Sequence, residues 1–290
     1  MKNKYFGSEI MSRIIKARLL TAFTEYMISE ELCRGTREKY ARDVGNFARW
    51  LNGRDVNREE AAQWKQQLLD RGYAPATVNS MLAALNTFFR FAGWEDCRLK
   101  FLRIQRQMFR DKARELTEVE YHRLVRTAAT KGDQRLALLL EAIGSTGVRV
   151  SEVKYITVEA ARAGRTDISL KGKFRTILLP TQLCRKLLDY ARKNKIASGE
   201  IFLTKGGVGL SRKQIWTQMK QLCEAAGVEK SKVFPHNLRH MFATVFYRTT
   251  KDIARLADVL GHARVETTRI YLLTTGKEHL RLLDRMRLIC

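Results

Sequence analysis

Only one stretch of this 290-residue chain has the sequence pattern of β-strands. Residues 168–170 and 176–179 are short apolar runs that flank the basic segment 171–175, which predicts a β-hairpin with a basic tip. Most of the remaining sequence places apolar residues at helical spacing. We therefore expect a mainly α protein with a small β-hairpin or sheet.

The first third of the chain predicts a bundle of four helices, at about 19–32, 37–51, 58–72 and 77–94. Asn57 is expected to cap the third helix. Their apolar positions repeat at steps that place them on one face of each helix, and this face is expected to form the core. These positions include Leu20, Phe23, Met27, Tyr40, Val44, Phe47, Leu51, Val78, Leu82, Leu85, Phe88 and Phe89.

The charge balance favours a polyanionic partner. Lys and Arg number 54 against 30 Asp and Glu, a formal net charge of +24 at pH 7. Such a chain attracts nucleic acid, because neutralised phosphates release counterions. A basic solvated surface, as on a ribosomal or membrane-surface protein, is the alternative that charge alone leaves open. No apolar run reaches the roughly 20 residues of a membrane helix, and the five cysteines show no paired or zinc-like spacing.

The domains are expected at 13–97 (helical bundle) and 116–290, joined by a basic linker at 98–115. The linker is either a solvated tether or a DNA contact through Arg103, Arg106, Arg110 and Lys112. Thr117 and Glu120 have the spacing of a capping box, which predicts the first helix of the second domain. Further helices are expected at 133–144, 181–193, 211–226, 235–248, 251–260 and 266–273.

Two motifs in the second domain place cations and a carboxylate together. Arg149 and Glu152 are three residues apart at an expected helix start, so they share a face; alone, they fit a surface salt bridge. His236 and Arg239 also share a helix face, and His240 lies one step round. An imidazole and a guanidinium at one point suit a phosphate. Seen alone, the pair is better explained as a capping His and a surface Arg.

The third motif ends in a tyrosine. Gly261 has the position of a helix-ending glycine, and His262 follows it in a turn. Tyr271 comes nine residues later in a short expected helix. A lone tyrosine at such a position is usually a core residue. Yet three of the five histidines lie between His236 and His262, which packing alone does not explain.

In this order and at these intervals, the motifs resemble the tyrosine recombinase (phage integrase) family, of the simple two-domain Xer-like type. The resemblance covers 116–290 throughout and, less specifically, the helical region before it. It implies a SAM-like core-binding, DNA-binding domain over 13–97 and a mixed α/β catalytic domain over 116–290, without an additional N-terminal arm-binding module. The two domains would form a C-shaped clamp on DNA.

The resemblance also implies roles for individual residues. Arg149 and Arg239 would clamp the scissile phosphate, and Glu152 would support the first arginine. His236 is the histidine beside the second arginine and a plausible proton acceptor. His262 stands where the family has His or Trp.

Tyr271 would be the nucleophile. The catalytic lysine of the hairpin is expected to be Lys171, with Lys173 as the alternative, since the turn looks one residue shorter than the family's. This lysine would protonate the leaving 5′-oxygen. His240 is a supporting residue, and Arg175 near the hairpin tip is expected to contact DNA.

The implied reaction is site-specific DNA recombination through a covalent 3′-phosphotyrosine intermediate, with no cofactor and no metal. Its partner would be double-stranded DNA with specific recombination sites, and four copies of the chain would assemble as a homotetramer on two such sites. Accessory DNA-bending proteins could also take part, and no membrane is expected. The expected location is the bacterial cytoplasm, in association with the nucleoid. Integration, excision, inversion and dimer resolution stay open.

Three other functions share some of these features. A type IB topoisomerase-like relaxing enzyme shares the chemistry, a DNA-binding protein that has lost catalysis shares the fold, and a basic coating protein shares only the charge. The tail after Tyr271 has an apolar face formed by Leu280, Leu283, Met286 and 288–289. It is expected to pack on its own domain or to dock on a neighbouring protomer, with neither favoured.

Overall fold

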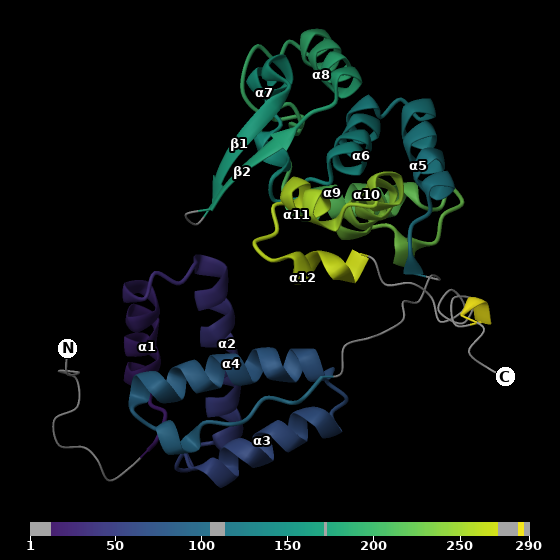
Figure 1. The fold of residues 1–290 in the computed structure, drawn as a ribbon. Coiled ribbons are helices and arrows are strands. Elements are labelled where there is room, and N and C mark those ends of the chain that lie inside the picture. Colours follow the sequence, from purple (N-terminus) through teal and green to yellow (C-terminus); the bar gives the residue numbers. More distant parts are fainter. Residues whose placement is uncertain (1–12, 105–113, 171–172, 272–283, 287–290) are drawn as a thin grey trace. The chain divides into compact units, whose positions relative to one another are not determined.

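The computed structural model describes residues 13–104, 114–170, 173–271 and 284–286, and the chain divides into two compact units (Figure 1). The first unit is Met1–Arg106 and the second is Gln107–Cys290. Within the described residues, helices predominate, and the one sheet has two strands. The predicted fold class, mainly α with a small β-hairpin, is confirmed.

The N-terminal unit contains the four predicted helices in the predicted order. They are α1 (Ala17–Ser29), α2 (Arg34–Leu51), α3 (Arg58–Asp70) and α4 (Pro75–Ala92), followed by the 3₁₀ turn η1 (Glu95–Cys97). The side chain of Asn57 accepts from the Glu60 N–H, which confirms the predicted cap of α3. Helix α2 begins at Arg34, earlier than predicted, because the N–H groups of Thr36 and Arg37 already bond to the Cys33 carbonyl.

Aromatic rings form the core of this unit. Phe23, Phe47, Phe88 and Phe89 are fully buried, and Trp64 is nearly so. The rings meet largely edge to face, as between Phe23 and Phe88 with centroids 5.2 Å apart. Such pairs add to the free energy gained from burying apolar surface. The predicted inward positions of α4 are all buried, so the periodicity of this helix identified its core face correctly.

Two asparagines on α4 hold the chain that follows the bundle. Asn86 donates from Nδ2 to the Leu99 carbonyl and accepts the Leu99 N–H at Oδ1, both at 2.9 Å. Asn79, seven residues earlier on the same face, makes the same two bonds with Leu102, at 2.9 and 2.7 Å. Each asparagine side chain thus bonds the N–H and C=O of one residue, as a neighbouring strand would. These bonds fix the path of the chain as it leaves the unit.

The second unit contains helices around one hairpin. Its elements are α5 (Glu118–Thr130), α6 (Gln134–Thr146), η3 (Val153–Tyr155), α7 (Val158–Ala163), β1 (Arg165–Leu170), β2 (Lys173–Leu178), α8 (Thr181–Lys193), α9 (Arg212–Leu222), η4 (Lys230–Lys232), α10 (Pro235–Thr250), α11 (Ile253–Leu260), α12 (Val265–Thr268) and η5 (Arg269–Tyr271). Helix α6 is central, since Leu139, Leu140, Ala142 and Ile143 are fully buried. The predicted capping box of Thr117 and Glu120 is present at the start of α5.

Two local predictions in this unit were wrong. The expected helix start at Arg149 is a turn followed by η3, because Gly147 ends α6 at φ +62° and the Glu152 carboxylate takes the Arg149 N–H. The strands of the hairpin are longer than predicted, since Leu170 pairs with Lys173 and Ile168 with Arg175. The basic segment 173–175 therefore belongs to β2, and the turn itself (171–172) lies outside the described residues. Helix α7 was not predicted.

Among the described residues, no helix is long and apolar enough to cross a membrane.

We expect Asn86→Ala to destabilise the N-terminal unit by about 1–3 kcal/mol, because it leaves the buried N–H and C=O of Leu99 without partners. Urea unfolding of the full chain, followed by tryptophan fluorescence, measures this loss, since three of the four tryptophans lie in this unit. Asn79→Ala is the matched control: Asn79 is only partly buried, so water can replace its bonds and the loss should be smaller. An equal or larger loss at Asn79 contradicts the assignment.

Candidate active site

Arg149 is held by the carboxylate of Glu152. Its Nη1 donates to Glu152 Oε1 at 2.8 Å, and its backbone N–H donates to Oε2 at 3.0 Å. The Arg149 side chain is 40% exposed, whereas that of Glu152 is 5% exposed. The predicted pair therefore forms, but around a buried carboxylate in a turn. The guanidinium of Arg149 therefore reaches the surface, and the buried carboxylate of Glu152 fixes its orientation.

Glu152 is ionised despite its burial. Burial alone raises the pKa of a carboxyl group, but hydrogen bonds from Arg149 and the charges of Arg175 and Arg149 outweigh this and hold the pKa of Glu152 below its ordinary value. A buried anion of this kind is stable only while its cations stay in place.

Arg239 lies deeper in the same site. It is 2% exposed, and its guanidinium donates to the Gly147 carbonyl at 2.5 Å and to the Leu260 carbonyl at 2.7 Å. Burial and the nearby charge of Arg149 lower the pKa of Arg239 to about 10, which leaves it charged at neutral pH. The two carbonyls end α6 and α11, so Arg239 caps both helices at once.

His262 lies against Arg239 in its neutral form. Arg239 Nη2 donates to His262 Nε2 at 3.0 Å, since a guanidinium has no acceptor. The proton of the neutral ring is then on Nδ1, which faces Thr268 Oγ1 at 2.9 Å. Burial first, and then the charges of Arg239, Arg149 and Arg175, lower the pKa of His262 from 6.5 to about 4.

Tyr271 packs among three histidine rings. Its centroid lies 4.7 Å from His240, 5.9 Å from the nearly parallel ring of His262, and 6.4 Å from His236. The side chain is 5% exposed, and a hydrogen bond with Tyr271 is among the interactions that raise the pKa of Arg239. The structure therefore brings residues from α10, the turn after α11 and η5 to one point.

Two glycines make this close packing of the turns around Arg239 feasible. A Cβ at Gly147 would lie 2.4 Å from Phe242 Cδ1, and a Cβ at Gly261 would lie 2.3 Å from Arg175 Cδ. Both residues also have positive φ, +62° and +64°, which favours glycine. The Gly261 prediction as the end of α11 is confirmed.

Most of the other predicted site residues lie outside the described part of the chain. Lys171 lies outside the described residues, and so does the side chain of Lys173, whose backbone begins β2. In the linker, Arg106, Arg110 and Lys112 lie outside the described residues, as does the predicted apolar tail except Met286. Arg103 is described and is exposed.

The side chain of Arg175, which was predicted to contact DNA, points into the protein. It is 9% exposed and donates to Glu152 Oε2 at 2.7 Å and to the Val259 carbonyl at 2.9 Å. The guanidinium is thus buried and paired with an ionised carboxylate, a position suited to holding other residues in place.

Thr268 and Asn237 also support the site, although no sequence motif indicated them. Thr268 is fully buried and orients His262, while Asn237 donates to the carbonyls of Arg114 and Lys232 at 2.7 and 2.8 Å and anchors the start of α10. Their position within one helical turn of a predicted site residue was the available signal. In the described residues, no group of three or more His, Cys, Asp or Glu could hold a metal ion.

Comparison with known families decides to which family this chain belongs. Residues 114–277 match the phage integrase family, and residues 20–96 match the phage integrase N-terminal SAM-like domain. The chain belongs to the phage integrase family. The family resemblance that the motifs predicted is thereby confirmed, and so is the enzyme class, a tyrosine-type site-specific DNA recombinase.

Relatives of similar length are tyrosine recombinases. XerA of Thermococcus kodakarensis is 30% identical over 273 residues, covering 91% of this chain and 93% of its own length. XerA of Pyrococcus furiosus is 28% identical and covers 96% of both chains. XerD of Caulobacter vibrioides is 28% identical and covers 89% of this chain and 92% of its own.

Solved structures share the phage integrase fold. A lambda integrase dimer bound to a COC′ core site superposes with a TM-score of 0.72 at 17% identity, covering 90% of this chain and 96% of its own. The XerH recombinase bound to its difH substrate gives a TM-score of 0.67 at 18% identity, covering 92% and 84%. At these identities the likeness concerns the fold.

We expect the His262 ring of this integrase-family chain to stay neutral at pH 6, with an NMR titration midpoint of about 4. The C2–H resonance that disappears in His262→Gln assigns the signal. Between pH 4 and 6.5 the unfolded chain binds a proton that the folded chain excludes, so stability should rise with pH across this window. His262→Gln should flatten that rise, and a midpoint near 6.5 contradicts the buried, arginine-flanked position.

Proposed function

We propose that this chain cleaves and rejoins DNA strands at specific sites through a covalent 3′-phosphotyrosine on Tyr271. The observation that carries the proposal is the convergence of Tyr271 with Arg239 and three histidine rings. A tyrosine with only a packing role does not require a buried guanidinium beside it, because burying that charge is costly.

The two arginines are suited to hold the scissile phosphate. Arg149 is partly exposed while anchored on Glu152, so it can reach a phosphate without losing its orientation. Arg239 has five N–H donors. Three serve Gly147, Leu260 and His262, and a further hydrogen bond joins it to Tyr271, which leaves one donor for a phosphate oxygen. Guanidinium binds such oxygens in pairs, and its charge stabilises the negative charge of the transition state.

The proposed cleavage step exchanges one phosphodiester bond for another. Tyr271 Oη attacks the phosphorus, the P–O5′ bond breaks, and the enzyme is left joined to the 3′-phosphate. The phenol proton passes to His236, which is exposed beside the Tyr271 ring. The leaving 5′-oxygen takes a proton from the hairpin lysine, Lys171 or Lys173. Rejoining is the reverse step with a 5′-hydroxyl as nucleophile, so the bond energy is conserved.

His262 and His240 are proposed to support the nucleophile. Neutral His262 accepts from Arg239 and stacks on the Tyr271 ring, so it couples the guanidinium to the phenol. His240 packs edge-on against the same ring from within α10, and its Nδ1 lies 3.5 Å from Thr244 Oγ1. Together they restrict the rotation of Tyr271.

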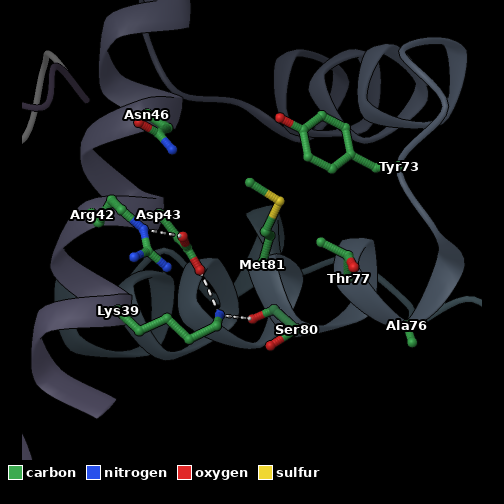
Figure 2. A pocket seen from close by; sticks show the side chains of 9 residues that line it. All are labelled: Lys39, Arg42, Asp43, Asn46, Tyr73, Ala76, Thr77, Ser80 and Met81. Carbon is green, nitrogen blue, oxygen red and sulfur yellow. Dashed lines mark hydrogen bonds and ion pairs between the residues drawn. The ribbon is translucent and has the colours of Figure 1, made fainter. Parts of the chain in front are cut away.

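The N-terminal unit has a pocket whose lining includes Lys39 and Arg42 (Figure 2). Figure 2 shows Lys39 and Arg42 converging on Asp43, which is 2% exposed, and Lys39 also donating to the Ser80 carbonyl. The two cations outnumber this carboxylate, so the pocket keeps a net positive charge. We place a DNA contact here and on the basic linker, including Arg103.

The partner proposed for this chain is double-stranded DNA carrying specific recombination sites. Recombination exchanges strands between two sites, so we propose four protomers on two DNA sites, with room for accessory DNA-bending proteins. The same proposal includes the domain limits 13–97, 98–115 and 116–290. It also includes a location in the cytoplasm, on the nucleoid. Residues of the tail would pack on their own domain or on a neighbouring protomer.

Tyr271→Phe should abolish covalent protein–DNA adducts while DNA affinity is retained, since the change removes only the attacking oxygen. A suicide substrate with a nick beside the cleavage site traps the adduct, which is counted on a denaturing gel. The target is found by binding-site selection with covalent trapping. Adducts that persist in Tyr271→Phe overturn the nucleophile assignment, and cleavage of every supercoiled plasmid without site preference favours a relaxing enzyme.

Adduct formation should continue in the presence of EDTA, because the proposal assigns charge compensation to Arg149 and Arg239. The same assay is run with and without chelator and with added magnesium. Arg149→Lys serves as a companion variant and should reduce the rate, since lysine offers no bidentate contact. Loss of cleavage under chelation that magnesium restores indicates a metal-dependent nuclease instead.

A further inference from the structure

Arg175, on β2, sends its side chain inward and links three parts of the site. Its Nη1 donates to Glu152 Oε2 at 2.7 Å, and its Nη2 donates to the Val259 carbonyl in the last turn of α11, at 2.9 Å. Only 9% of the side chain is exposed. Both Nη groups therefore serve acceptors of the protein, from two elements far apart in the sequence.

Glu152 depends on this arginine for its orientation. Oε1 accepts from Arg149 Nη1, while Oε2 accepts from the Arg149 N–H and from Arg175 Nη1. With a cation on each oxygen, the plane of the carboxylate is fixed. Without Arg175, the buried carboxylate would face one guanidinium and could rotate, and the exposed end of Arg149 would move with it.

The turn that leads to His262 lies directly on the Arg175 side chain. A Cβ at Gly261 would lie 2.3 Å from Arg175 Cδ and 2.7 Å from its Nε, closer than real Cβ atoms approach. The buried Nε of Arg175 has no hydrogen-bond partner. A buried N–H without a partner costs free energy, so hydrogen bonding alone does not set the position of this side chain. The contact with the turn at Gly261 also restricts it.

We propose that Arg175 is a positioning residue for strand cleavage, which fixes the Glu152–Arg149 pair relative to the hairpin and to the turn that carries His262. This inference rests on the proposed function. It requires arginine, because a planar guanidinium with donors on two Nη atoms can serve acceptors from two elements, whereas an ammonium is a single point. Arg175 is two residues beyond Lys173, so the same contacts hold the strand that bears this candidate lysine.

The test compares the rate of covalent adduct formation with DNA affinity in the full chain. Single-turnover rates on the suicide substrate are measured at saturating protein, and dissociation constants are measured over a range of salt. Arg175→Met should reduce the rate by roughly 10- to 100-fold, the range typical for misplaced or unsupported catalytic groups. Arg175→Lys should recover part of that loss. Affinity and its salt dependence should match those of the wild type.

Arg165→Met is the matched control. Arg165 lies on β1 of the same hairpin and is exposed, so the change removes the same charge from the same element without touching Glu152. Its rate at saturating protein should stay within about twofold of wild type, since surface substitutions away from such networks have small effects.

A double-mutant cycle separates positioning from general destabilisation. If Arg175 acts through Glu152, then Glu152→Gln and Arg175→Met should together reduce the rate little more than either change alone. Rates are taken at a temperature where circular dichroism shows each variant to be folded. Independent, multiplying effects on the rate overturn the proposed connection.

A second pair of variants covers the case in which Arg175→Met does not fold. Gly261→Ala adds a methyl group that collides with Arg175, and Gly164→Ala adds one at a similar φ, +69°, with nothing within 4 Å. Both changes carry the same backbone strain, but only Gly261→Ala should slow adduct formation at saturating protein. Equal rates in the two variants overturn the proposal.

The outcomes also distinguish this inference from the proposed function. If the wild-type chain forms no adduct on any selected site, the proposed function fails. If the wild type forms adducts and Arg175→Met forms them at the same rate, the positioning role fails. Weaker binding with a salt slope reduced by about one, at an unchanged saturated rate, makes Arg175 a phosphate contact and likewise overturns the role.

Discussion

The site depends on one buried carboxylate. Glu152 accepts hydrogen bonds from Arg149 and Arg175, and its charge offsets part of the repulsion between these two arginines. Both arginines also lie close enough to Arg239 to lower its pKa. The ionised carboxylate keeps this group of cations stable, and removing it would leave buried charge uncompensated.

Carbonyl groups at the ends of two helices hold the guanidinium of Arg239. The carbonyls of Gly147 and Leu260 end α6 and α11 and carry partial negative charge, which suits the guanidinium of Arg239. Glycines are needed where these turns meet Phe242 and Arg175, because a Cβ would overlap the neighbouring side chain. The turns thus serve two purposes at once: they stop the helices and they bind the cation that faces Tyr271.

Much of the site could be predicted from the sequence because it lies in short motifs. His236 and Arg239 share a helical face by spacing alone, and Gly261 marks the end of α11 by its conformational freedom. The turn at Arg149 could not be predicted, since the Glu152 side chain replaces a backbone acceptor there and stops a helix that the local pattern favours. Arg175 was expected to contact DNA near a basic hairpin tip. The sequence could not show that its side chain faces inward, since the buried face of a strand depends on its pairing, which here places Ile168 opposite Arg175.

The sequence by itself determined the mainly helical class, the four-helix bundle with its aromatic core, and the set of residues that we propose bind and attack a phosphodiester. These follow from periodicity, capping and side-chain chemistry, which are local properties. Only the tertiary structure decided that Tyr271 stacks on His262, that Arg239 joins the ends of two helices, and that Arg175 turns inward to Glu152. These contacts join residues far apart in the chain, and the packing of their elements fixes them.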